Sequence, residues 1–186
     1  FGDVKKGGTC NVFSASVDIH CTGTHTECIG HVNDSNIQVP DVCPSGFIFS
    51  QLISVSPETA DGTNDSYHIE LSTDLIITKH ILEEKIAESH KALILRTLPN
   101  MESKKSRNYD KHPAPFFTND AIEYLNELAI EHLLVDLPSI DKADDDGQLG
   151  NHHLFFKQGK TVSELLYIPN SVSDGFGFLQ IQIPNW

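Results

Sequence analysis

The chain has 186 residues, of which 39% are hydrophobic, a length and composition typical of a single domain with a substantial buried core, so we expect one domain over residues 1–186. Acidic residues outnumber basic ones 26 to 13, and the formal net charge of -13 argues against nucleic acid or an anionic membrane surface as a partner. No run approaches the roughly 18 apolar residues that a membrane-spanning helix needs, so we expect no membrane insertion.

The start of the chain and its thiols bear on its cellular context. The sequence opens on Phe1 and its only methionine is Met101, so we expect the native protein to have further N-terminal residues. Four cysteines lie in the first quarter of the chain: Cys10, Cys21, Cys28 and Cys43. They form no C-x-x-C pair, and a domain of this size does not need disulfides. We expect reduced thiols, as in the cytoplasm, although the sequence leaves the compartment open.

The first half of the chain is typical of β-strands. Apolar residues alternate over residues 11–19, and β-rich runs follow at residues 47–55 and 67–71. Residues 76–90 then carry isoleucine and leucine at helical intervals, which predicts a helix. A short, continuous apolar run at residues 92–95 predicts a buried strand.

The second half mixes loops, helices and strands. Residues 100–115 are polar and rich in lysine and proline, which predicts an exposed loop. The clearest helix starts near Thr118, whose side chain and its two polar neighbours offer capping oxygens, and its apolar face continues to Ala129. Further elements follow in chain order: a buried strand at 133–137, an acidic turn at 144–147, a short helix at 152–158 and a final strand at 176–183. This order predicts an α/β or α+β fold with a sheet and flanking helices.

The tract of residues 21–31 carries the side chains that indicate chemistry. In an extended chain His25 and Glu27 project from the same face, because side chains in a strand alternate. A histidine and a carboxylate on one face, joined by His152 and Glu164 far downstream, suit a divalent cation with an open catalytic position. Without a cation, two carboxylates and two imidazoles would force a carboxylate to hold a proton or an imidazole to be charged. The pattern therefore predicts a metal-dependent hydrolase.

The same tract also carries a family resemblance. It reads Gly23-Thr24-His25-Thr26-Glu27 with His31 four positions on. This resembles the signature H-x-G-T-H-x-D-x-P-x-H of the cyclase family of metal-dependent hydrolases, which includes bacterial kynurenine formamidase and isatin hydrolase. Three further blocks stand in the family's order: Ala92-Leu93-Ile94-Leu95-Arg96-Thr97, then Val135-Asp136-Leu137-Pro138-Ser139-Ile140-Asp141, then His152 followed by Gly159 and Glu164. Together the blocks cover nearly the whole chain from residue 10 to 170.

The resemblance implies a swivelling β/β/α fold, a homodimer and a small-molecule substrate. It also implies a divalent-metal site with the ligands His25, Glu27, His152 and Glu164, and it gives His31 the role of general acid/base. Nitrogen and carboxylate donors of this kind suit zinc or manganese, and the sequence does not choose between the two.

The chain departs from the signature at three positions. The family's first histidine falls on Cys21, and His20 stands one position earlier. The thiolate of Cys21 is a good zinc ligand, whereas a bulge before Gly23 would turn His20 inward instead, so both remain candidates. Glu27 stands where the family has aspartate, and Ile29 where it has proline.

Two functions remain open from the sequence. The first is hydrolysis of an amide or cyclic amide, such as an N-formyl aryl amine, by metal-activated water with His31 as general acid/base; this would be an arylformamidase-like enzyme. The alternative is a non-catalytic small-molecule binding relative with a degenerate metal site, and it is motivated by Cys21 and Glu27.

Other polar residues have plainer interpretations. On a helix, His153 would point away from the face that carries His152, so we expect it at the surface. Asp136, Ser139 and Asp141 are typical of strand ends and turns, with support for a metal ligand as the less favoured alternative. Arg96 could bind a substrate carboxylate or form a structural salt bridge.

Overall fold

A six-stranded mixed sheet forms the centre of the fold in the computed structural model, which describes residues 2–87, 90–157 and 159–184. Its strands, in spatial order, are β1 (His25–Glu27), β8 (Thr161–Glu164), β7 (His132–Val135), β5 (Ala92–Thr97), β2 (Ile48–Val55) and β9 (Gly175–Leu179). The four inner strands are parallel to one another, whereas β1 and β9 are antiparallel at the two edges. Among the inner strands β5 and β7 are largely apolar, and every residue of β7 and β8 is buried.

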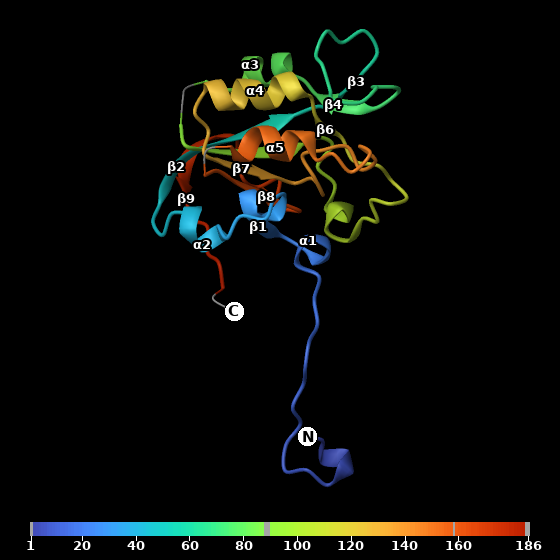
Figure 1. The fold of residues 1–186 in the computed structure, drawn as a ribbon, viewed down its shortest axis with the longest axis vertical. Coiled ribbons are helices and arrows are strands. Elements are labelled where there is room, and N and C mark those ends of the chain that lie inside the picture. Colours follow the sequence, from blue (N-terminus) through green and yellow to red (C-terminus); the bar gives the residue numbers. More distant parts are fainter. Residues whose placement is uncertain (1, 88–89, 158, 185–186) are drawn as a thin grey trace.

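A second, smaller sheet and a layer of helices complete the fold (Figure 1). The small sheet contains β3 (Glu58–Thr59), β4 (Leu75–Ile77) and β6 (Phe116–Phe117). The helices α3 (Lys79–Lys85), α4 (Asn119–Glu127) and α5 (Gly150–Phe156) lie together on one side of the central sheet. Two single-turn helices, α1 (Ile19–Thr22) and α2 (Val39–Val42), lie near β1. Two sheets with a helical layer confirm the expected α/β fold of the swivelling β/β/α type.

One apolar core joins the helices to the central sheet. Leu93 and Leu133 from the inner strands are fully buried in it, together with Leu125 of α4. Phe155 and Phe156 of α5 are buried in the same core, so this helix is held firmly against the sheet. Because these two rings hold the C-terminal end of α5, the core also fixes the side chains near the N-terminal end of this helix.

The strand predicted at residues 11–19 is wrong. Residues 11–18 form no strand, and the chain leads away from the body there before α1 begins (Figure 1). The apolar side chains of this stretch, including Val12 and Phe13, are exposed, the latter at 90%. Alternation describes which face a side chain would take, but a strand also needs a hydrogen-bonded neighbour, and the described chain supplies none here.

Two further predictions in the middle of the chain are corrected. Residues 67–71 form no strand, because the ring of Tyr67 packs on Phe116 and its hydroxyl bonds to a buried carboxylate. The helix predicted at residues 76–90 begins only at Lys79 and ends at Lys85. The residues before it belong to β4, and the hydroxyl of Thr78 caps the helix by accepting a bond from the main chain of the next turn. Residues 88–89 of that prediction lie outside the described residues.

The remaining elements are confirmed, with shifts at their ends. The predictions at residues 47–55, 92–95 and 133–137 correspond to β2, β5 and β7. The helix at Thr118 is α4, and the hydroxyl of this residue caps it. Residues 144–147 form a turn, and the predicted helix at 152–158 is α5, although residue 158 lies outside the described residues. The final strand is shorter than predicted and ends at Leu179.

The predicted loop at residues 100–115 is exposed over most of its length and contains one 3-10 turn, Glu102–Ser106. Asn100 is buried, and the ammonium group of Lys104 is buried against Asp136. Among the described residues no helix is long and apolar enough to cross a membrane.

Candidate metal centre

The edge of the central sheet where β1 meets β8 brings two of the predicted ligands together. In the antiparallel register His25 stands opposite Glu164, and His25 Nε2 lies 3.6 Å from Glu164 Oε2. His25 Nδ1 donates to the carbonyl of Gly23 at 2.9 Å, because a carbonyl can only accept. This contact leaves the lone pair of Nε2 pointing into the cluster. Glu27 lies two residues along β1 and is buried on the same face, as the alternation predicts.

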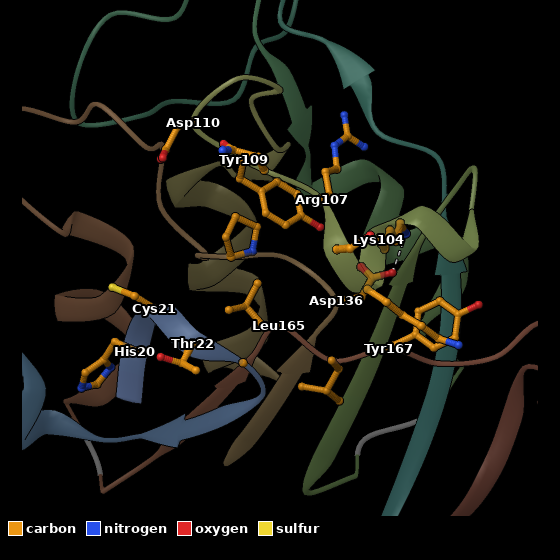
Figure 2. Close-up of a pocket in the computed structure, with 16 residues that line it drawn as sticks. His20, Cys21, Thr22, Lys104, Arg107, Tyr109, Asp110, Asp136, Leu165 and Tyr167 are labelled. Carbon is orange, nitrogen blue, oxygen red and sulfur yellow. Dashed lines mark hydrogen bonds and ion pairs between the residues drawn. The ribbon is translucent and has the colours of Figure 1, made fainter. Parts of the chain in front are cut away.

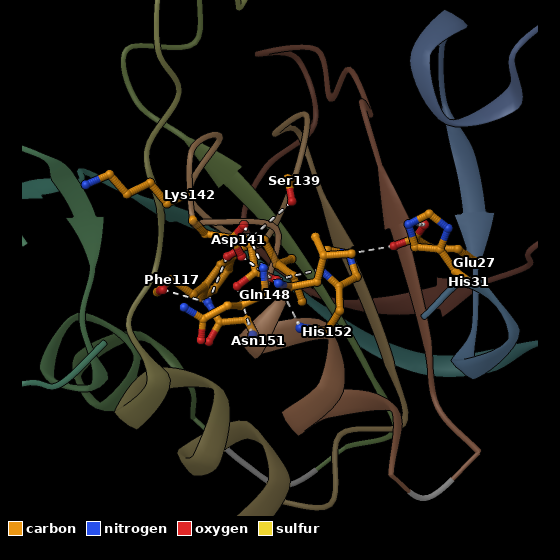
Figure 3. A network of polar contacts seen from close by, with 12 residues as sticks. Glu27, His31, Phe117, Ser139, Asp141, Lys142, Gln148, Asn151 and His152 are labelled. Carbon is orange, nitrogen blue, oxygen red and sulfur yellow. Dashed lines mark hydrogen bonds and ion pairs between the residues drawn. The ribbon is translucent and has the colours of Figure 1, made fainter. Parts of the chain in front are cut away.

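Helix α5 supplies the next side chain. His152 Nε2 lies 2.6 Å from Glu27 Oε1 and 3.4 Å from Glu164 Oε1. On the other side of the ring, Nδ1 donates to Asp141 Oδ2 at 2.6 Å (Figure 3). The carboxylate therefore fixes the orientation of the ring and directs Nε2 at the two glutamates.

Several polar atoms in this cluster have no hydrogen-bond partner among the described residues. They include His25 Nε2, Glu27 Oε1 and His152 Nε2, all buried; the last two lie 2.6 Å apart as an ion pair but outside hydrogen-bond geometry. A buried polar atom without a partner costs about 1–3 kcal/mol, so three in one place need an explanation. One ligand atom each from Glu27, His152 and Glu164 lies within 4.8 Å of the others. A second triad, His20, His25 and Glu27, shares Glu27 with the first. A divalent cation bound between the two triads would satisfy the orphaned atoms, because imidazole nitrogens and carboxylate oxygens are metal ligands.

The pKa values of Glu27, His152 and Glu164 are shifted because these side chains are buried and their charged groups lie close together. Burial raises the pKa of Glu164, with the neighbouring charge of Glu27 adding to it. Burial acts to lower the pKa of His152, but the carboxylates of Asp141, Glu164 and Glu27 outweigh it and raise the pKa well above the ordinary value. Burial acts to raise the pKa of Glu27, but contacts with His152 and the neighbouring histidines lower it overall. In the metal-free cluster, protons therefore occupy positions that a cation would take.

His20 and Cys21, the two candidates for the place of the family's first histidine, lie in different surroundings. His20 lies on α1 and places Nδ1 at 2.9 Å from Glu27 Oε2. Its ligand atom also groups with those of His25 and Glu27. Cys21 is exposed and its thiol is free. The bulge that we considered before Gly23 is replaced by the single helical turn of α1, which turns His20 toward the cluster.

His31 lies on the 3-10 turn Ile29–His31 rather than on a continuation of β1. Its Nε2 is 3.5 Å from Glu27 Oε2, and its ring stacks on that of His20 with centroids 4.1 Å apart. Burial lowers the pKa of His31, and the nearby histidines lower it further, although Glu27 opposes them. A neutral imidazole at the open side of the cluster can accept a proton.

Other polar residues fall into structural positions. Arg96 pairs with Asp174 at 2.8 Å and also donates to the carbonyls of Pro169 and Val172, so it forms the structural salt bridge rather than a substrate contact. His153 is exposed, as expected.

Asp141 is predicted to be a strand-end or turn residue, but in the structure it supports His152. Its carboxylate accepts the bond from His152 and a second from the hydroxyl of Tyr67 at 3.0 Å. A histidine ligand needs an acceptor for its second nitrogen, so a carboxylate close to His152 could have been sought from the sequence. The chain offers several acids there, however, and spacing alone does not select among them.

Two pockets adjoin the cluster. One of about 460 Å³ is lined by Glu27 and His31, and a second of about 680 Å³ meets the cluster at His20 (Figure 2). His20 lines the larger pocket on one side, and residues 104–110 line it on the other. This larger pocket can hold a small organic molecule.

The chain matches a family described as putative cyclase over residues 8–142, which is more than half of its length, and it belongs to this family. Kynurenine formamidase from Bacillus thuringiensis (strain Al Hakam) is 28% identical to it over 171 residues, which cover 92% of this chain and 71% of the relative. Kynurenine formamidase from Bacillus mycoides (strain KBAB4) is 26% identical over 179 residues, covering 96% and 76%.

Solved structures share the fold. A potential metal-dependent hydrolase with cyclase activity superposes with a TM-score of 0.61 at 18% identity and covers 86% of this chain and 68% of its own. Isatin hydrolase A from Labrenzia aggregata superposes with a TM-score of 0.57 at 19% identity, covering 86% and 65%. These likenesses confirm the predicted family and its fold.

Proposed function

We propose that the protein is a metal-dependent hydrolase that cleaves an amide or cyclic amide, with N-formyl aryl amines as the first class to test. The observation that carries the proposal is the convergence of His25 Nε2, Glu27 Oε1 and His152 Nε2, all buried and without hydrogen-bond partners among the described residues, beside an open pocket. The kynurenine formamidases and isatin hydrolase among the similar proteins support this reaction class.

The ligands in this proposal are His25, Glu27, His152 and Glu164, with His20 in place of the family's first histidine. A bound dication would lower the pKa of a water to about 7 and polarise the amide carbonyl. Zinc and manganese both suit this donor set. The homodimer implied by the family resemblance stays a prediction.

The chain's own residues supply the proton transfers. His31 takes a proton from the attacking water as a C–O bond forms at the carbonyl carbon. It then returns this proton to the leaving nitrogen as the C–N bond breaks. One water is consumed, and the products are a carboxylic acid and a free amine, with formate as the acid when the substrate is an N-formyl compound.

The test is an assay of protein that has been stripped of metal and reloaded with zinc or manganese, on N-formylkynurenine and simple formanilides. We expect turnover that depends on added metal. His31→Gln should keep its metal content and lose roughly 100-fold or more in kcat, because a general base contributes that much. His153→Gln, which changes an exposed histidine, is the matched control. A metal-loaded protein that hydrolyses none of these amides would favour the non-catalytic alternative.

A further inference from the structure

The pocket beside the candidate metal centre has one wall in the loop predicted at residues 100–115, where the sequence led us to expect the residues that set specificity. Residues 104–110 form it, opposite the α1 residues His20, Cys21 and Thr22 (Figure 2). His20 belongs to both places, because it lines the pocket and lies 2.9 Å from Glu27 Oε2 in the cluster. A molecule bound in the pocket would therefore lie between this wall and the cluster, which it would meet at His20.

The wall is fixed to the body by a buried ion pair. Lys104 Nζ lies 2.7 Å from Asp136 Oδ2, and both side chains are more than nine-tenths buried. The same ammonium also donates to the main-chain carbonyl of Thr97, and Asp136 accepts two bonds from Thr97 as well. Since Asp136 follows directly on β7, the wall is held by the central sheet.

The basic residues of the wall are not equally available to a ligand. Four of the chain's 13 basic residues fall within residues 100–115, against two acidic ones there. The charge of Lys104 is engaged by Asp136, and Lys105 pairs with Glu102 at 2.8 Å. Arg107 lines the pocket, and among the residues that the structure describes its guanidinium pairs with no carboxylate.

The side chain next to Arg107 is aromatic. Tyr109 is half-buried in the wall, and the guanidinium carbon of Arg107 lies 5.6 Å from the centroid of its ring. Tyr167 adds a second ring to the pocket lining. Figure 2 shows Tyr109 between Arg107 on one side and Asp110, the acidic residue of this rim, on the other. An aromatic face beside a guanidinium suits a planar ligand that carries a carboxylate, since arginine binds carboxylates through two parallel bonds.

We propose that this pocket selects aryl carboxylates, with the ring of the ligand on Tyr109 and its carboxylate on Arg107. The inference rests on the proposed function, because it names the substrate class of that same site. It also gives a role to the local basic segment in a chain whose net charge of -13 would otherwise repel an anion.

The test compares binding of 2-aminobenzoate with binding of 2-aminobenzamide, its neutral near-isostere, to the metal-loaded protein by calorimetric titration. We expect the acid to bind about 10-fold or more tightly than the amide, as a charge-assisted bidentate contact implies. Arg107→Gln should raise the Kd of the acid by about the same factor and leave that of the amide unchanged. Asp110→Asn, which removes a negative charge from the rim, should tighten binding of the acid.

Matched variants separate this role from a general effect of charge. Lys111→Gln removes the same charge from the same exposed segment, but the residue does not line the pocket, so binding should not change. Tyr109→Leu should weaken both ligands, whereas Tyr109→Phe should weaken neither, because the ring is retained.

The inference is overturned if the acid and the amide bind equally, if neither binds, or if Arg107→Gln behaves like Lys111→Gln. Turnover is not measured in this experiment, so the outcomes for the two proposals can be told apart. A protein that hydrolyses no amide and yet shows the Arg107-dependent preference would refute only the proposed function. A protein that hydrolyses formanilides without the preference would refute only the substrate class.

Discussion

The carboxylate of Asp141 holds the imidazole of His152 in place. Oδ2 accepts the ring Nδ1–H at 2.6 Å and the main-chain N–H of the same residue at 3.1 Å. Oδ1 accepts from the hydroxyl of Tyr67 and from the main chain of Asn151. Three of these four bonds are directed at the start of α5, so the ring can present only Nε2 to Glu27 and Glu164.

Replacing this carboxylate should weaken metal binding. In Asp141→Asn the amide can still accept one bond but no longer stabilises the ring as a charged acceptor, and we expect metal affinity to fall by about 10- to 100-fold. Competition titration against a chelator of known affinity measures the effect. Asp144→Asn removes a charge from an exposed position on the same turn and is the control. Equal affinities for the two variants would show that Asp141 does not support the metal ligand.

The choice between His20 and Cys21 can be decided by a pair of variants. His20 places Nδ1 beside Glu27, whereas Cys21 is exposed, so His20→Ala should lower metal affinity and Cys21→Ala should leave it unchanged. The same competition titration measures both. The reverse result would mean that the thiolate takes the position of the family's histidine.

Local sequence patterns correctly predicted the elements whose structure depends on residues close to them in the sequence. The cap at Thr118 predicts the start of α4, and the apolar run at residues 92–95 predicts β5. The alternation of His25 and Glu27 predicts their shared face correctly. In each case the side chains within a few residues are sufficient to select the structure.

The wrong predictions fall where contacts with residues distant in the sequence determine the structure. Residues 11–18 alternate like a strand, yet the described chain gives them no neighbouring strand. Ile76 and Ile77 fit a helix by spacing but pair with Phe116 and Phe117 in the small sheet. Likewise, the bond between Asp141 and His152 depends on how the turn before α5 folds, and no spacing rule gives that.

Metal binding should release protons. In the metal-free protein the pKa of His152 is raised by the surrounding carboxylates, and burial raises that of Glu164, so both hold protons more readily than usual. A cation displaces these protons, and its affinity should therefore rise with pH by about tenfold per unit for each proton released. Calorimetry in buffers of different ionisation enthalpy counts the protons. A heat that does not vary with the buffer, with an affinity constant between pH 6 and 8, would contradict this prediction.

The ion pair between Lys104 and Asp136 should matter for stability. Lys104→Met leaves the fully buried carboxylate of Asp136 without its cation, and we expect the free energy of unfolding to fall by about 3 kcal/mol. Lys105→Met disrupts an exposed pair with Glu102 and a cation–π contact with the ring of Tyr167, and it should lower the free energy of unfolding far less than Lys104→Met does. Urea denaturation of both variants provides the comparison, and similar midpoints for the two would refute the role of Lys104 in holding the pocket wall.

The central claim is that β1, β8 and α5 deliver their donors to one shared ion. The most direct measurement is an anomalous difference map, collected at the absorption edge of zinc from crystals of the zinc-loaded protein. We predict a single strong peak within bonding distance of His25 Nε2, His152 Nε2 and the carboxylates of Glu27 and Glu164. A map with no peak there, or with its only peak among His68, Asp141 and Asp145, would contradict it.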